Sequence, residues 1–533
     1  MAQSTAVASA GQPTLAAGTL GLWGQLFQAI THMAPAAGIV FSATYMASQG
    51  GGSHALAYVI ATIACTLSAI CLKELVKKVR SAGGYFVIHS VALGDAAGFT
   101  TSWLYFLYDP VIVAAGSLLW PAVFTDFLRS QAGIDLPWWL FSFVMAGVLF
   151  TVTFVGVRQA AVVSMILGSI ETLVFALFGI ILIAKAGGNQ PIVSFTPSAS
   201  PSAWGGVMFA SVFAILSFIG FESGVPMAEE SHNARRNVII GLMVSTIGIG
   251  LFYIAMGYAT VAGWSGIPGA THVAADGSTV QDYINFSTWS PDNAKQFAGN
   301  FGSLGAAPAY FELATRSFGR IGPLLMLLML TNSMFAVGVA ATNATTRVVF
   351  SLGRAQILPG ILGHINSSTR TPDVSIACVS LAGLLIALFF GLVIGPDPYT
   401  AYGLMGLLAT IGAIVLYLMT NASVVRMYTK LYPRELDVLQ HLLVPLLATI
   451  FFLPPMVVAL YPRSLDVIGM GFDNTYPISL ALPVSIAWAV IGVVFYVYLR
   501  VLRPHTLVNL ATEMERVTLV GEAEEAERVR RRA

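Results

Sequence analysis

Three carboxylic residues, Asp109, Glu171 and Glu222, stand inside long apolar stretches of the sequence. An acidic side chain at the centre of a membrane helix costs about 2.5–3.5 kcal/mol on insertion scales, so such residues are functional candidates. A carboxylate in this setting can bind an ammonium group or carry a proton. The three residues therefore indicate chemistry with cations or protons inside an apolar protein.

Asp109 and Glu171 have the plainest apolar surroundings. Asp109 follows LYFLY and precedes Pro110. We expect it to face a central cavity and to bind a substrate ammonium group or a transported proton; the alternative is a structural carboxylate paired with a hydroxyl or amide. Glu171 stands in LGSIETLVFALFG, where it is either a functional or a structural carboxylate.

Proline and glycine interrupt two of the apolar stretches. QAITHMAPAAGIVFSATYM contains Pro35 and Gly38, and FAILSFIGFESGVPMAEES contains Gly220 and Pro226 on either side of Glu222. Irregular backbone at membrane depth is tolerated only beside a cavity or within protein. The amides that such a break exposes can hold a carboxylate, and the carbonyls can accept from an ammonium group. The pair of breaks favours a binding site for a zwitterion, although either proline alone could be only a kink.

The predicted substrate contacts lie at these two breaks and at Asp109. They are Ala34, Pro35, Ala36, Ala37 and Gly38 at the first break, and Ser217, Phe218, Ile219, Gly220, Phe221 and Glu222 at the second. Phe218 or Phe221 could form an aromatic lid, or either ring could pack in the core.

Further polar residues are candidates for coupling or gating. Asn332 and Ser333, with Glu171 and Asp109, could bind a coupling ion, although such residues often only form hydrogen bonds between helices. His32 beside the first break is a possible proton sensor or a simple hydrogen-bonded histidine. Four charged residues form either an inner-gate cluster or a solvated loop: Glu229, Glu230, Arg235 and Arg236.

The composition requires these residues to be positioned by membrane helices. The chain has 533 residues, of which 56% are hydrophobic and 10% are charged, and its mean hydropathy is +0.78. Soluble proteins carry about 25% charged residues. A membrane-spanning helix needs roughly 20 apolar residues. We therefore predict an all-α membrane protein with twelve spans, at 22–48, 54–78, 97–125, 136–157, 161–186, 205–228, 237–262, 320–353, 374–395, 400–426, 440–460 and 478–502.

Several function classes are disfavoured. The net charge of +1 argues against a nucleic-acid partner. The sequence has no His-x-x-x-His metal pair and no Gly-x-Ser-x-Gly elbow, so an enzyme is not expected, and neither is a cofactor. The three cysteines, Cys65, Cys71 and Cys378, are expected to be small core residues.

The basic residues predict an orientation. Twenty of the 26 Lys and Arg residues fall on the side of the loop after the second predicted span, and six fall on the other side. Basic residues favour the cytoplasmic side. We therefore expect a multi-pass protein of the plasma (inner) membrane with both termini cytoplasmic. Residues 1–20 are predicted to be a disordered tail, 504–533 a charged tail, and the external connection 263–319 could hold short helices.

Four stretches carry a family resemblance. They are RSAGGYFVIHSVALGDAAGFTTSWLYFLY, SFIGFESGVPMAEESHNARRNV, ATTRVVFSLGRAQILPGILGHINSSTRTP and LMTNASVVRMY. In order and spacing the chain resembles the amino acid–polyamine–organocation transporter superfamily. One departure is the first break, which reads Met33-Ala34-Pro35-Ala36-Ala37-Gly38 where the family usually has a Gly-x-Gly type sequence.

The resemblance implies a leucine-transporter-type fold, with a 5+5 inverted repeat and discontinuous helices one and six. A transporter domain at 21–503 would then consist of repeat one (about 22–186), repeat two (about 205–426) and helices eleven and twelve (about 440–502). The resemblance also implies substrate-carboxylate contact at the first break. At Glu171 it implies a group that takes the place of a sodium ion, so that Glu171 could carry a proton.

The functional expectation is secondary active transport by alternating access. The substrate would be an amino acid or related amino compound, in symport with a proton or, less favoured, a sodium ion. The alternative is a polyamine, organic-cation or inorganic-cation carrier of the same fold. A receptor would need a large soluble output domain and a channel a repeated filter-like loop, and the sequence shows neither. The expected partners are the small molecule, the ion and the lipid bilayer.

Overall fold

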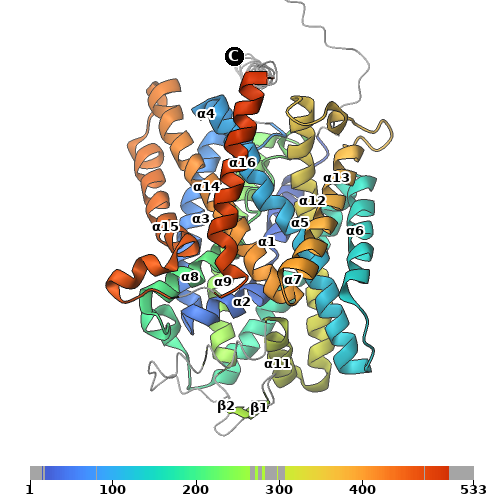
Figure 1. The fold of residues 1–533 in the computed structure, drawn as a ribbon, viewed down its shortest axis with the longest axis vertical. Helices are drawn as coiled ribbons and strands as arrows, with labels where there is room; N and C mark the ends of the chain where they lie inside the picture. The colour runs from blue at the N-terminus through green and yellow to red at the C-terminus, as the bar shows by residue number, and fades with distance from the viewer. Residues whose placement is uncertain are drawn as a thin grey trace, which may run out of the picture.

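The computed structural model describes residues 15, 18–79, 81–264, 271–273, 279–281, 297, 306–472 and 475–502. Most of the expected tail 1–20, all of 504–533 and most of the connection 263–319 lie outside the described residues. Within the described part, the chain folds into upright helices that form one bundle (Figure 1). One short antiparallel pair, β1 (Thr271–Val273) and β2 (Thr279–Gln281), lies at the lower end of the bundle in that view.

The helices follow the apolar stretches of the sequence. The first half of the chain forms α1 (Leu22–Met33), α2 (Pro35–Gly50), α3 (His54–Val76), α4 (Tyr85–Leu93), α5 (Asp95–Ala132), α6 (Trp138–Val155), α7 (Val157–Ala186), α8 (Ala203–Phe218) and α9 (Ala234–Gly263). The second half forms α11 (Ala306–Phe318), α12 (Gly322–Arg354), α13 (Asp373–Phe389), α14 (Pro398–Arg426), α15 (Val444–Leu460) and α16 (Ala481–Leu502).

Eleven helical stretches in the described part are long and apolar enough to cross a membrane, where the sequence predicts twelve spans. The difference lies in the predicted sixth span, 205–228. Its helix, α8, is apolar but ends at Phe218, and turns follow it. Gly220 has a φ of +108°, which leaves the helical region, and Pro226 offers no amide hydrogen to continue a helix.

Two other features differ from the prediction. The loop expected after the second span contains a short helix, α4, and Cys378 is exposed on α13 although we expected all three cysteines in the core. By contrast, Cys65 and Cys71 are buried. The connection 263–319 does hold one short helix among its described residues, α11.

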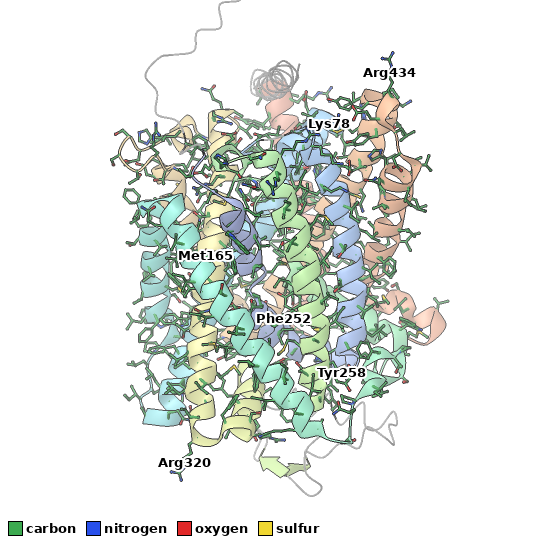
Figure 2. The ribbon with its side chains drawn as sticks, turned by 180° about the vertical axis from the view of Figure 1, so that it is seen from behind. Lys78, Met165, Phe252, Tyr258, Arg320 and Arg434 are labelled. Carbon is green, nitrogen blue, oxygen red and sulfur yellow. The ribbon has the colours of Figure 1, made fainter. Side chains whose placement is uncertain are left out.

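The outer surface of the bundle is apolar. Leu173, Ile180, Leu251 and Val493 are each more than 60% exposed. Water does not favour such a surface, but the hydrocarbon of a bilayer does. Charged residues lie at both ends of the bundle, beyond this apolar surface: Lys78 and Arg434 at one end and Arg320 at the other (Figure 2).

The interior is built around α5 and the helices that pack against it. α5 contacts α4, α6, α12, α13 and α14, while α2 packs on α8 and α3 packs on α9. These contacts bring the loop between α1 and α2, the end of α8 and the middle of α5 into one central region. The carboxylates singled out in the sequence therefore lie close to both interrupted stretches.

Candidate functional site

The first break is a single residue wide. α1 ends at Met33, α2 begins at Pro35, and Ala34 between them has a left-handed backbone with φ of +48°. Pro35 suits the first position of α2 because the amide hydrogen that proline lacks would have had no partner there. The chain thus changes direction at Ala34 while both flanking helices remain intact.

The amides at the start of α2 are held by two other helices. The Ala36 amide donates to Glu171 Oε1 of α7 at 2.6 Å, and the Ala37 amide donates to Ser333 Oγ of α12 at 3.0 Å. The Ser333 hydroxyl in turn donates to the same Glu171 oxygen at 2.5 Å. Glu171 is fully buried, and its other oxygen has no hydrogen-bond partner among the described residues. Its carboxylate therefore sits at the positive end of the α2 dipole.

The second break brings α8 against the first. α8 ends at Phe218, and the chain turns at Gly220. A Cβ atom at Gly220 would lie 2.4 Å from the ring of His32, so only glycine leaves room for that ring. The side chain of His32, the last residue but one of α1, thereby fills the turn that follows α8.

One tyrosine joins the two helix ends. The hydroxyl of Tyr253, on α9, lies 2.5 Å from the carbonyl oxygen of Met33 and 2.8 Å from that of Ser217. Tyr253 is completely buried and stacks on Tyr58 of α3. Sequence reasoning missed this residue because a lone tyrosine in an apolar span has no pattern that distinguishes it.

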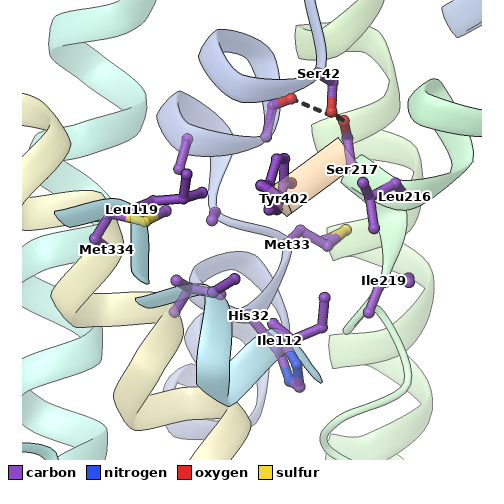
Figure 3. Close-up of a pocket in the computed structure, with 15 residues that line it drawn as sticks. His32, Met33, Ser42, Ile112, Leu119, Leu216, Ser217, Ile219, Met334 and Tyr402 are labelled. Carbon is purple, nitrogen blue, oxygen red and sulfur yellow. Dashed lines mark hydrogen bonds between the residues drawn. The ribbon is translucent and has the colours of Figure 1, made fainter. Parts of the chain in front are cut away.

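A cavity of about 40 Å³ lies beside the first break, and we call it the upper cavity from its position above His32 in Figure 3. Among the described residues its wall includes Ala34, Ala37, Gly38, Ser217 and Ile219 of the predicted contacts. Figure 3 shows the hydrogen-bonded hydroxyls of Ser42 and Ser217 at one end of this space, with His32 and Ile112 at the other. It also shows the ring of Tyr402 between them.

Ser217 connects the groups around the upper cavity. Its hydroxyl lies 3.0 Å from the carbonyl oxygen of Gly38, 3.2 Å from Ser42 Oγ and 3.3 Å from the Tyr58 hydroxyl. The cavity is therefore mainly apolar with a hydroxyl cluster at one end. Its volume is enough for only a few water molecules, and the residues of its wall are buried.

A lower cavity of about 10 Å³ lies on the other side of His32, which lines both spaces. Asp109 and Glu222, 0% and 4% exposed, form part of its wall. His32 Nε2 approaches Asp109 Oδ1 at 3.1 Å, although the pair lacks good hydrogen-bond alignment. Ser223 and three tyrosines complete the polar lining, the tyrosines being Tyr85, Tyr105 and Tyr108.

Hydroxyl groups hold the two carboxylates of the lower cavity. Asp109 Oδ2 accepts from Tyr105, and from Thr345 of α12 at 2.7 Å. Glu222 accepts long contacts from the Tyr417 hydroxyl, at 3.4 and 3.5 Å, and interacts with the backbone amides of Gly220 and Glu222. Asp109 is thus held by side chains of α5 and α12, whereas Glu222 is held mainly at the turn after α8.

The remaining predicted residues lie outside both cavities. Phe218 packs edge-on against Tyr253, and Phe221 packs against Tyr417, so both rings belong to the core in this conformation. The Asn332 side chain donates to the Leu167 carbonyl at 3.0 Å and joins α12 to α7. Pro35, Ala36, Gly220, Glu171 and Ser333 shape the breaks without lining either space.

A buried ion pair lies toward the end of the molecule that carries α4. Glu230 and Arg347 pair at 2.9 Å with both side chains at most 1% exposed, and Glu229 pairs with Arg354 at 3.1 Å. The ion-pair partners of these two glutamates are therefore both on α12, and Glu229 Oε1 also accepts from the Ala82 amide at 2.9 Å. The Leu20 amide also donates to the Glu230 carbonyl at 3.0 Å, which ties the segment before α1 to this network.

Comparisons with known proteins agree with this architecture. Residues 24–506 match the family model described as "Amino acid permease". The chain is 25% identical to cationic amino acid transporter 5 of Arabidopsis thaliana over 64% of this chain and 55% of that protein. It is 23% identical to a branched-chain amino acid permease of Bacillus subtilis, over 62% of this chain and 66% of that one, and 20% identical to a methylthioribose transporter of the same organism, over the same shares.

The matched region spans between about half and two thirds of the length of these relatives. The family match, in contrast, extends from the first helix to just beyond the last described one. That family consists of transporters and not of enzymes. The chain, whose described residues include eleven candidate membrane spans, belongs to the amino acid permease family of the amino acid–polyamine–organocation superfamily.

Proposed function

We propose that this protein carries an amino acid, or a related small amino compound, across the plasma membrane by alternating access. The observation that supports this most is the meeting of two interrupted helices at closed cavities. The break at Ala34 and the turn at Gly220 lie together, with hydroxyls on one side of His32 and carboxylates on the other. Such a closed space suits the occluded step of a carrier.

Helix packing supports a 5+5 repeat. In the first repeat, helices one to five are α1–α2, α3, α5, α6 and α7. In the second repeat, the corresponding helices are α8 with its turn, α9, α12, α13 and α14. Four equivalent pairs then pack against each other, namely α2 with α8, α3 with α9, α5 with α12, and α6 with α13. A two-fold axis in the membrane plane brings equivalent elements together in this way. α15 and α16 add two helices, which gives twelve spans within the described part of the chain.

We further propose that transport is coupled to protons through Glu171. Its carboxylate is fully buried, holds the start of α2 and retains one oxygen without a described hydrogen-bond partner. Protonation would remove the negative charge that α2 and Ser333 stabilise, and so would loosen α7 and α12 from the first break. A sodium ion at Glu171 and Ser333 is the alternative coupling ion.

A carrier of amines without a carboxylate is the second candidate function. The observation in its favour is that the Ala36 and Ala37 amides donate hydrogen bonds to Glu171 and Ser333. From the sequence, these amides were expected to bind a substrate carboxylate. Asp109 and Glu222 would then provide the main attraction for the ligand.

A thermal-shift screen of the purified protein tests the proposal, because a ligand that binds the native state raises its thermal midpoint. The ligands are amino acids, their carboxyl amides and polyamines, at two pH values and with or without sodium. Stabilisation by amino acids that is lost with the carboxyl amides supports the first function. Stabilisation by amines alone supports the second, and uptake of the same compound into proteoliposomes confirms transport. A protein that neither binds nor takes up any of these compounds would contradict both.

A further inference from the structure

The lower cavity combines two buried carboxylates with no basic side chain other than His32. None of the described residues that line either cavity is a lysine or an arginine. Buried ionised carboxylates need a compensating positive charge, because water no longer stabilises them. A cation beside Asp109 and Glu222 would supply that charge.

His32 is the group within the site that can supply this charge. Its Nε2 faces Asp109 at 3.1 Å, and its Nδ1 has no hydrogen-bond partner among the described residues. The other titratable groups that line the cavities or contact Glu222 are neutral when protonated: Tyr85, Tyr105, Tyr108, Tyr402 and Tyr417. A proton on His32 would thus be the one positive charge among these groups.

We propose that the lower cavity is a cation subsite in which the proton of His32 and an ammonium or guanidinium group of the substrate are alternative occupants. When the substrate cation takes the place beside Asp109 and Glu222, the N–H bond of the imidazolium breaks. The electron pair stays on the nitrogen, and the proton passes to water. The inference rests on the proposed function, because it requires a ligand with a cationic nitrogen.

The position of the ring explains how this exchange would affect the whole site. His32 belongs to α1, fills the space left by the missing Cβ of Gly220 and lines both cavities. A change in its charge therefore acts at the first break, at the second break and on Asp109 of α5 at once. Glu171 lies apart from this group on the α7 side of α2, so the two acidic centres can be tested separately.

Calorimetry of the full-length purified protein measures the exchange. Binding of L-lysine, L-leucine and putrescine is titrated in two buffers of different ionisation enthalpy, at about pH 5.5 and at about pH 9. We expect release that approaches one proton per bound ligand at the lower pH and disappears at the higher pH, by linkage. His32→Gln is expected to bind without proton release, because glutamine can still face Asp109 but cannot titrate.

The control is His364→Gln, at an exposed histidine paired with Asp373 outside the cavities, which should release protons as the wild type does. Release with all three ligands assigns the subsite to the α-ammonium or an equivalent amine, and release with only L-lysine and putrescine assigns it to a second ammonium group. Binding by the wild type without proton release would overturn the inference even if His32→Gln failed to fold, as would equal release by a folded His32→Gln protein. Absence of any binding would instead count against the proposed function.

Discussion

Tyr253 has one hydroxyl proton but two carbonyl acceptors, so its hydrogen bonding depends on the positions of both helix ends. The Met33 and Ser217 oxygens both lie within 2.8 Å of that hydroxyl, so the proton is shared between the ends of α1 and α8. If either helix end moved, the hydroxyl could follow the other end and keep one good hydrogen bond. The residue therefore positions both breaks and does not need to touch the substrate.

Tyr253→Phe should destabilise the protein by about 1–3 kcal/mol, because it leaves buried carbonyls without their donor. We expect a lower thermal midpoint and slower proteoliposome uptake. The matched control is Tyr258→Phe on the same helix, whose hydroxyl bonds to the partly exposed Gln190 at 2.9 Å. Equal effects of the two substitutions on uptake would contradict the positioning role.

Gly220→Ala should reduce stability and uptake more than the addition of one methyl group would suggest. The new Cβ would lie 2.4 Å from the His32 ring, and alanine is strained at a φ of +108°, at a cost of about 1–3 kcal/mol. We expect loss of uptake and a lower thermal midpoint. Gly248→Ala, at a helical glycine with open space around its Cβ position, should leave both unchanged or slightly improved. Normal uptake by Gly220→Ala would contradict this expectation and show that the His32 ring can adopt another position.

At this scale the sequence predicts charged residues better than neutral ones. Asp109 and Glu222 could be found because a carboxylate in an apolar span is costly, and the structure places both on one cavity. Tyr253, Tyr85 and Tyr402 could not be found, since tyrosine is common in apolar helices and its role depends on contacts from distant parts of the chain. The substrate contacts predicted at both breaks remain predictions.

At the scale of helices, the start of α2 is controlled from α7. Glu171→Gln should keep the hydrogen bonds to the Ala36 amide and the Ser333 hydroxyl, because the glutamine carbonyl can accept both. We expect a folded protein that still binds ligand but no longer accumulates it when an inward proton gradient is applied. Glu171→Ala, which leaves both donors unpaired, should lower the free energy of unfolding by about 1–3 kcal/mol. Unchanged proton-driven accumulation by Glu171→Gln would remove this residue from the coupling mechanism.

The buried pair between Glu230 and Arg347 joins the segment after α8 to α12. Glu230→Gln leaves the Arg347 charge buried without its counter-ion, which should cost about 3–5 kcal/mol. Thermal unfolding in detergent measures the loss. The control is Asp135→Asn, which breaks the exposed pair with Arg129 and should have no measurable effect. A small effect of Glu230→Gln would mean that water reaches the pair.

The helices themselves were largely predictable because long apolar stretches have few other solutions in a bilayer. The predicted sixth span shows the limit of that reasoning. The apolar sequence continues past Phe218, but the helix ends there. Gly220 and Pro226 indicate an interruption in the sequence itself, whereas the packing of the His32 ring against Gly220 joins α1 to the segment after α8 and cannot be read from either segment alone.

At the scale of the whole molecule, charge should determine how the bundle lies in the membrane. Lys78 and Arg434 mark the end of the bundle that carries α4, and Arg320 marks the opposite end (Figure 2). Basic residues are retained on the cytoplasmic side, so the first end should face the cytoplasm. The buried pair of Glu230 and Arg347 would then close the cytoplasmic entrance, and α11 would lie at the external one.

Cysteine labelling measures this orientation directly. In a Cys378→Ser background, which removes the exposed native thiol, Arg434→Cys and Arg320→Cys each place one thiol at an exposed position. A membrane-impermeant maleimide should label Arg320→Cys in intact cells, and should label Arg434→Cys only after the cells are permeabilised. The background protein, whose Cys65 and Cys71 are buried, should stay unlabelled in both conditions. The reverse labelling pattern would place α11 in the cytoplasm and assign the buried ion pair to the external entrance.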